Sequence, residues 1–223
     1  MKKLEGNTVK YEVPRTTTAL FQGDSITEAG RDYTRDDSLG TGYVMMIANW
    51  FSADNTEKKV KFLNRGVAVD KIKDLKNRWQ NDCLNLEPDI VSILIGINDI
   101  VGGHFWKSPT STKSFEEDYR TILEQTRDIV GAKIVLLTPF MVYRTKPQLV
   151  YKIILKQKID VVKKLSKEFK TLLVPLDRIF EEATRKREPT YWSADGIHPT
   201  AMGHSLIAES WLKSINGSLT LKT

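Results

Sequence analysis

Three residues that together perform acyl transfer in other proteins stand near the two ends of this 223-residue chain. Ser25 follows an apolar run and Gly23, a residue that lets the backbone bend sharply. His198 follows Asp195 by three residues, an offset that brings a carboxylate to the imidazole Nδ1 in a turn. A serine hydroxyl needs such a base to take its proton during attack. The pattern predicts Ser25 as nucleophile, His198 as base and Asp195 as the acid that orients it.

Acyl transfer also needs hydrogen-bond donors where negative charge develops on the carbonyl oxygen. Gly66 and Asn98 each follow a predicted strand, as Ser25 does. We expect the backbone amides of Ser25 and Gly66 and the side-chain amide of Asn98 to form this oxyanion hole. Each residue also has a simpler explanation when taken alone: a turn serine, a turn glycine and a helix cap.

Apolar runs and helical spacings alternate along the chain and predict the elements that position these residues. The predicted strands are residues 17–21, 59–63, 90–95, 133–137 and 172–176, and the predicted helices are 42–51, 69–84, 114–130, 149–169, 179–187 and 200–215. Ser114 and Glu117 fit a capping box at the start of one helix. Residues 1–16 carry no clear period and are expected to form an edge strand or a loose arm. The alternation predicts a mainly parallel sheet covered on both faces, with ligands at the carboxyl ends of its strands.

The composition limits the class of protein and its partners. With 40% hydrophobic residues, the chain can bury one substantial core, and we expect a single domain over residues 1–223. The net charge of +6 comes from 34 basic and 28 acidic residues in a mixed pattern, so no nucleic-acid partner is expected. No apolar stretch of spanning length and no signal sequence is seen, which predicts no membrane partner and a cytoplasmic location.

The cysteine and the histidines restrict the chemistry further. A single cysteine, Cys83, excludes an intrachain disulfide and is expected to be a small core residue. The chain has only three histidines, and they lack the spacing of zinc ligands. No metal and no other cofactor is therefore predicted.

Four sequence blocks resemble, in order, those of the SGNH (GDSL-type) hydrolase superfamily. They are Gly23-Asp24-Ser25-Ile26, Asn64-Arg65-Gly66, Gly96-Ile97-Asn98-Asp99 and Asp195-Gly196-Ile197-His198-Pro199. Ile26 stands where the family name expects leucine. The resemblance implies a three-layer α/β/α sandwich with a mainly parallel five-stranded sheet, a flavodoxin-like arrangement. It also implies the same nucleophile, base, acid and oxyanion hole as the residues do.

Further segments look like the intracellular xylan acetylesterases of that superfamily, which remove acetyl groups from xylo-oligosaccharides. These are residues 39–44, 74–79, 91–99 and 198–204. The likeness implies a small acylated sugar as substrate and a homo-oligomeric assembly. Trp106, Tyr191 and Trp192 stand in predicted loops and are candidates to stack on a sugar ring, with plain packing as the alternative.

Two other functions remain open at this point. A lysophospholipase or thioesterase would act on longer acyl chains, and it would need an extended apolar groove, against which the polar segment 31–37 argues. A non-catalytic carbohydrate-binding protein would keep the fold without using the serine. Phosphoryl transfer at Asp24 lacks both a second aspartate two residues later and a phosphate-binding glycine loop.

Overall fold

The computed structural model describes residues 11–100, 109–143, 148–149 and 151–217. Within this part of the chain, five strands form one sheet in the order β2-β1-β3-β4-β5, and all neighbouring strands are parallel. The strands are β1 (Thr16–Gly23), β2 (Lys59–Gly66), β3 (Ile90–Leu94), β4 (Lys133–Leu137) and β5 (Leu172–Val174). The order reverses between β1 and β3, and open α/β sheets bind ligands beyond the carboxyl ends of the strands at such a point. The predicted α/β class and five-stranded sheet are confirmed.

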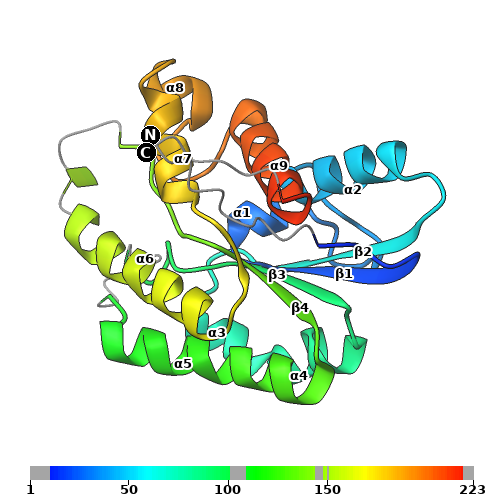
Figure 1. Ribbon diagram of the computed structural model, residues 1–223. Helices are drawn as coiled ribbons and strands as arrows, with labels where there is room; N and C mark the ends of the chain where they lie inside the picture. The colour runs from blue at the N-terminus through cyan, green and yellow to red at the C-terminus, as the bar shows by residue number, and fades with distance from the viewer. Residues whose placement is uncertain (1–10, 101–108, 144–147, 150, 218–223) are drawn as a thin grey trace, which may run out of the picture.

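Helices cover both faces of the sheet (Figure 1). One face carries α1 (Ser25–Glu28), α2 (Tyr43–Asp54), α7 (Leu176–Thr184), α8 (Pro189–Trp192) and α9 (Ala201–Ile215). The other face carries α3 (Ile72–Asn77), α4 (Trp79–Asp82), α5 (Thr112–Gln125) and α6 (Tyr151–Glu168). The sheet is therefore the middle of three layers.

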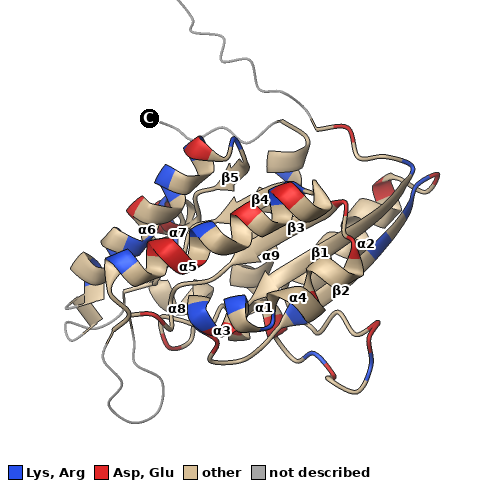
Figure 2. Ribbon diagram, turned by 90° about the horizontal axis from the view of Figure 1, so that it is seen from below, with Lys and Arg blue, Asp and Glu red and all other residues tan. Residues whose placement is uncertain are grey.

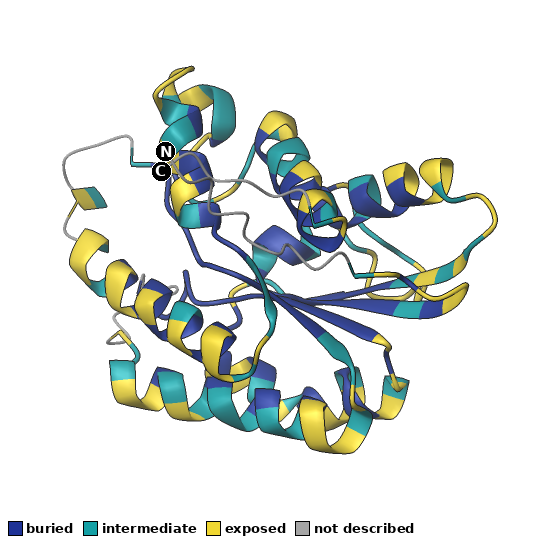
Figure 3. Cartoon of the chain, in the orientation of Figure 1, coloured by how far each residue is buried: buried dark blue, intermediate teal, exposed yellow. Residues whose placement is uncertain are grey.

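Alternation along the strands divides the core into two halves, one on each face. In β1, Ala19 and Phe21 join the cluster under α2 and α9, whereas Leu20 joins the cluster on the side of α3 and α5. Successive side chains of a strand point to opposite faces, so a strand covered on both sides is mostly apolar. All five residues of β3 are buried, as its central position requires (Figure 3).

Several predicted helices begin at other residues than the sequence indicated; α7, for example, begins at Leu176 and not at residue 179. The predicted helix 69–84 starts only at Ile72, because Val69 has a left-handed backbone (φ +61°) that no right-handed helix contains. The predicted capping box at Ser114 is wrong. The cap of α5 is Ser111, whose hydroxyl accepts the Ser114 N–H at 3.0 Å, so the helix begins three residues earlier than the capping-box pattern placed it.

Basic and acidic residues are interspersed along α5 and α6 (Figure 2). Lys164 of α6 pairs with Glu116 of α5 at 2.6 Å, and Arg120 of α5 pairs with Glu168 at the end of α6. The outer side of α6 thus carries charges of both signs that form ion pairs with α5.

Burial agrees with the prediction for Cys83, which is fully buried beside Trp79 in the core. Burial raises the pKa of its thiol to about 12, so the group stays a neutral, unreactive core residue. In the described ranges, no helix combines the length and the apolar character that crossing a membrane requires.

Candidate active site

The end of β1 places Ser25 at the carboxyl edge of the sheet. Gly23 is the last residue of β1, and a Cβ there would lie 2.2 Å from Thr27 Oγ1 and 2.4 Å from the Leu94 carbonyl oxygen. Only glycine allows the chain to turn this close to β3 and α1. Ser25 is the first residue of α1, and its side chain therefore emerges directly from the turn.

Asp24 is the cap of that short helix. Its Oδ1 accepts the Ile26 N–H at 3.0 Å, and the side chain is buried. Burial raises its pKa to about 7, against the opposing effect of the hydrogen bond from Ile26. Asp24 thus holds the backbone around Ser25 and takes no part in the hydrogen-bond chain described next.

Ser25, His198 and Asp195 form a continuous chain of hydrogen bonds. The distance from Ser25 Oγ to His198 Nε2 is 3.0 Å, and that from His198 Nδ1 to Asp195 Oδ2 is 2.6 Å. Partial burial alone would raise the pKa of Asp195, but bonds from the imidazole and from two backbone amides lower it to about 2. An ionised carboxylate only accepts, so the proton sits on Nδ1 and Nε2 is left to accept from the serine hydroxyl.

The loop between α8 and α9 fixes the imidazole. Ser193 Oγ donates to the His198 carbonyl at 2.8 Å and accepts the Gly196 N–H at 2.9 Å. Gly196 has φ +96°, a backbone that favours glycine, and its carbonyl accepts the Val142 N–H from the segment after β4. The segment from Asp195 to His198 is therefore held in one conformation by bonds to Ser193 and to Val142.

The hydrogen-bond chain lies at an open surface. The side chains of His198 and Asp195 are 54% and 51% exposed. A cavity of about 480 Å³ lies between α6, α7 and the segment after β4, but none of the three residues lines it. A bulky group attached to the ester can thus approach the serine from solvent.

Two of the predicted oxyanion donors have a hydrogen without a partner among the described residues. The N–H of Ser25 is the first amide of α1, so the helix offers it no carbonyl partner. The Asn98 Nδ2 donates one hydrogen to the Asp70 carbonyl oxygen at 3.1 Å, which leaves its second hydrogen available. Asn98 is largely buried, so its carboxamide is fixed in direction.

Gly66 has a different place from the one predicted. Its N–H already donates to the Asn64 side-chain oxygen at 2.9 Å. A Cβ at this position would lie 2.3 Å from the Glu28 backbone nitrogen. The glycine therefore permits β2 to approach α1, and its amide is engaged elsewhere.

Val69, which the sequence did not single out, carries a free amide in the same loop. Its left-handed backbone is rare for a β-branched residue and marks local strain. In the described part of the chain its N–H has no hydrogen-bond partner, and the next residue is Asp70, whose carbonyl holds Asn98. A glycine would have signalled this conformation in the sequence, whereas valine conceals it.

Two of the three predicted sugar-stacking aromatics are described, and both make other contacts. Trp106 lies outside the described residues. The Trp192 indole donates to the Ala183 carbonyl at 3.1 Å, and the Arg187 guanidinium lies 4.3 Å from the centre of the Tyr191 ring. Both rings contact the α7 region and each other, so sugar stacking by them stays a prediction.

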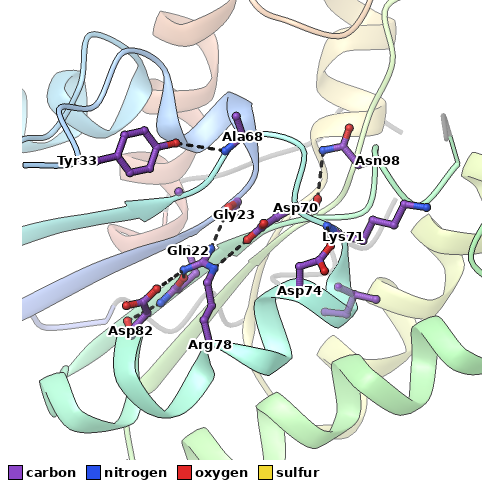
Figure 4. A network of polar contacts seen from close by, with 12 residues as sticks. Gln22, Gly23, Tyr33, Ala68, Asp70, Lys71, Asp74, Arg78, Asp82 and Asn98 are labelled. Carbon is purple, nitrogen blue, oxygen red and sulfur yellow. Dashed lines mark hydrogen bonds and ion pairs between the residues drawn. The ribbon is translucent and has the colours of Figure 1, made fainter. Parts of the chain in front are cut away.

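Tyr33 is an aromatic residue near the strained loop. The residue is 56% exposed, and its hydroxyl lies 3.4 Å from the Ala68 nitrogen (Figure 4). The Arg31 guanidinium covers one face of the ring, 4.3 Å from its centre. Tyr33 is thus a partly exposed aromatic residue next to the loop 67–72.

Most of the chain is similar to one known family of proteins. Residues 21–206 match the model of the GDSL-like lipase/acylhydrolase family. The chain belongs to this family. It is therefore a carboxylic ester hydrolase, as the blocks around Ser25 and His198 indicated.

Individual members of the GDSL-like family share most of the fold. An acetylxylan esterase of Geobacillus stearothermophilus is 31% identical over 204 residues, which cover 88% of this chain and 92% of the relative. The crystal structure of that enzyme superposes with a TM-score of 0.83, at 31% identity, over 89% of this chain and 94% of the other. A GDSL-like lipase from Parabacteroides merdae gives 0.86 at 32% identity, over 94% of this chain and all of the other.

Proposed function

We propose that this esterase cleaves acetyl esters through an acetyl-enzyme on Ser25. The observation that carries the proposal is the hydrogen-bond chain from Ser25 Oγ through the His198 imidazole to Asp195. Solved variants of the Geobacillus enzyme that are described as catalytic mutants have a serine or a histidine replaced by alanine. These variants support the roles of Ser25 and His198.

The proposed reaction has two displacements. Ser25 Oγ attacks the acetyl carbonyl carbon while His198 Nε2 takes the hydroxyl proton, and Asp195 stabilises the resulting imidazolium. The tetrahedral intermediate collapses, the bond to the alcohol oxygen breaks, and His198 protonates that oxygen. Water then attacks the acetyl-enzyme with His198 as base, and the breakdown of the second intermediate releases acetate and restores Ser25.

Three donors would bind the oxyanion in this proposal: the Ser25 N–H, the Asn98 Nδ2 and the Val69 N–H, which we place in the role first predicted for Gly66. The Ser25 and Asn98 groups have a hydrogen left over, and the Val69 amide is unbonded within the described residues. Removing one such donor typically lowers kcat by about 100 to 1,000-fold. We therefore expect Asn98→Ala to lose activity on this scale.

We further propose that the alcohol is a sugar, as in acetylated xylo-oligosaccharides. One variant of the Geobacillus protein is described as an acetyl-xylooligosaccharide esterase, which supports this substrate class. The half-exposed side chains of His198 and Asp195 suit an ester carried on a bulky, hydrated molecule. Tyr33, which is 56% exposed and next to the loop 67–72, offers an aromatic ring on which a sugar can stack.

Acetate release measures this substrate directly. The enzyme is incubated with acetylated xylo-oligosaccharides and with acetylated monosaccharides, and acetate is followed by NMR. We expect faster release from the oligosaccharides, and no release above background with Ser25→Ala. A Ser25→Ala protein with full activity would refute the proposed nucleophile.

A series of p-nitrophenyl esters from acetate to decanoate tests the acyl group. We expect kcat/KM to be highest for acetate and to fall with chain length. A rise with chain length would instead favour the lysophospholipase or thioesterase activity.

A further inference from the structure

Arg78 stands between α3 and α4 and contacts two segments of the proposed active site, the end of β1 and the loop 67–72 (Figure 4). Its Nε donates to Asp70 Oδ2 at 2.8 Å, and its Nη2 donates to the Gly23 carbonyl oxygen at 3.3 Å. Its Nη1 donates to Gln22 Oε1 and to Asp82 Oδ2, both at 2.9 Å. The side chain is only 18% exposed, so these bonds are sheltered from water.

Two of these contacts, with Gly23 and with Asp70, lead to the proposed oxyanion donors. Gly23 lies two residues before Ser25, at the turn that directs the Ser25 amide. Asp70 directly follows Val69, and its backbone carbonyl holds the Asn98 carboxamide at 3.1 Å. One guanidinium thus bonds to the segments that carry two of the donors and, through Asp70, to the side chain that carries the third.

A second anchor holds the far end of the same loop. The Ile72 N–H donates to Asp99 Oδ2 at 3.1 Å, and Asp99 is buried. The loop 67–72 is therefore fixed at Asp70 by Arg78 and at Ile72 by Asp99. A strained backbone such as that of Val69 persists only where its surroundings hold it this firmly.

We propose that Arg78 is a positioning residue that aligns the three oxyanion donors of this esterase. It touches no substrate and acts through Asp70 and Gly23. A planar guanidinium can donate in several fixed directions at once, which a lysine ammonium cannot match. The inference rests on the proposed function, because the alignment matters only if Ser25 forms a tetrahedral intermediate.

The expected kinetic effect is on the chemical step. A displacement of about 1 Å in a positioned group can lower the rate by about 100-fold. We expect Arg78→Gln to lower kcat by about 10 to 100-fold with KM changed much less, because the donors bind the transition state rather than the ground state. Arg78→Lys keeps the positive charge but not the planar set of N–H donors, and we expect an intermediate loss of kcat.

A double-mutant cycle with Asn98→Ala distinguishes positioning from general stability. If Arg78 aligns Asn98, Arg78→Gln will lower kcat less in the Asn98→Ala background than in the wild-type background. Equal fold-losses in the two backgrounds would overturn the proposal. Should Arg78→Gln fail to fold, the same cycle is run with Arg78→Lys.

Arg120→Gln is a matched control, since Arg120 also pairs with two carboxylates, Glu116 and Glu168, but on the outer surface of α5. All variants are assayed well below their measured Tm. We expect the control to lower Tm without changing kcat. A matching result for Arg78→Gln, with a lower Tm and unchanged kcat, would count against positioning.

Ser25→Ala separates the two proposals. If Ser25→Ala keeps full activity, the proposed function fails, and the Arg78 inference fails with it. If Ser25→Ala is inactive and Arg78→Gln shows no coupling to Asn98, only the positioning inference fails.

Discussion

At the scale of single residues, the reactivity of Ser25 depends on the ionised state of its most distant partner. Asp195 has its pKa lowered to about 2 by bonds from His198 and from the backbone, which outweigh the effect of partial burial. The carboxylate therefore stays charged at neutral pH and keeps the Nδ1 proton in place. This fixes Nε2 as the acceptor that faces Ser25.

His204 supplies a pH-dependent prediction. Burial lowers its pKa to about 4, and its Nδ1 accepts the Tyr43 N–H at 3.1 Å, so the folded protein keeps it neutral. The unfolded chain binds this proton near pH 6.5. The stability contributed by His204 is then complete above that pH and is lost as the pH falls from about 6.5 toward 4.

We expect His204→Asn to make the free energy of unfolding less dependent on pH in this window, because the asparagine oxygen still accepts from Tyr43 but does not titrate. Urea unfolding between pH 7.5 and 4.5 measures how the free energy of unfolding changes with pH in the wild type and in the variant. The same pH dependence in both would show that His204 does not contribute to it.

Val69 gives a second prediction at this scale. A left-handed β-branched residue costs about 1 to 2 kcal/mol, and glycine there costs about 0.5 to 1 kcal/mol in chain entropy. Val69→Gly is thus expected to raise the free energy of unfolding by up to about 1 kcal/mol while keeping most of the esterase activity, since the amide remains. Urea unfolding and p-nitrophenyl acetate hydrolysis measure the two effects. A clearly lower free energy of unfolding in Val69→Gly would show that the Val69 backbone is not strained.

The functional residues differ in how visible they were in the sequence. Ser25, His198 and Asp195 could be recognised from the sequence because their side chains are those that acyl transfer requires. The structure brings them within hydrogen-bond distance. Val69 contributes only a backbone amide, and its φ angle follows from the anchoring of its loop by distant residues. Arg78 shows no role until its contacts with Gly23 and Asp70 are known.

At the scale of elements, α9 links the core to the candidate site. It follows His198 by three residues and carries Trp211, whose indole N–H donates to Ser92 Oγ of β3 at 3.0 Å inside the core. Strand positions were predictable because apolar runs are unmistakable in a buried sheet. This bond was not, since the sequence does not show which polar atoms meet across 119 residues.

The Trp211 contact can be tested by removing one or both partners. Trp211→Phe leaves the buried Ser92 hydroxyl without a partner and shrinks the ring, so we expect a loss of about 1 to 3 kcal/mol. Adding Ser92→Ala should recover part of that loss, because no buried polar group then remains unpaired. A double variant less stable than Trp211→Phe alone, measured by urea unfolding, would contradict this account.

Element boundaries were predicted less well than the elements themselves. The break before α3 follows from Val69 and its anchors, and the start of α5 follows from Ser111, whose hydroxyl accepts the Ser114 N–H and caps the helix ahead of Ser114. Local spacing does not show which of two serines caps a helix, because this depends on which side chain reaches a free amide in the folded chain.

At the scale of the whole molecule, the order β2-β1-β3-β4-β5 brings the two ends of the sequence to one edge of the sheet. Ser25 follows the first strand, whereas His198 comes after the last strand and two further helices. The spatial meeting of residues 173 positions apart is therefore a property of the topology. The family blocks made it predictable, but the spacing of residues alone did not.

Assembly is the prediction that belongs to this scale. We propose that the enzyme forms a homo-oligomer, the state implied by its likeness to the xylan acetylesterases. Size-exclusion chromatography with light scattering at micromolar concentration should give a mass that is a multiple of 25.5 kDa. A single species of monomer mass across the concentration range would contradict this.

Trapping the covalent intermediate tests the central claim most directly. The enzyme is mixed with p-nitrophenyl acetate, quenched with acid within milliseconds and examined by intact-protein mass spectrometry and peptide mapping. We expect one added acetyl group, located on Ser25, and its absence in Ser25→Ala. Rapid turnover with an acetyl group on another residue, or Ser25→Ala turning over at the wild-type rate, would contradict it.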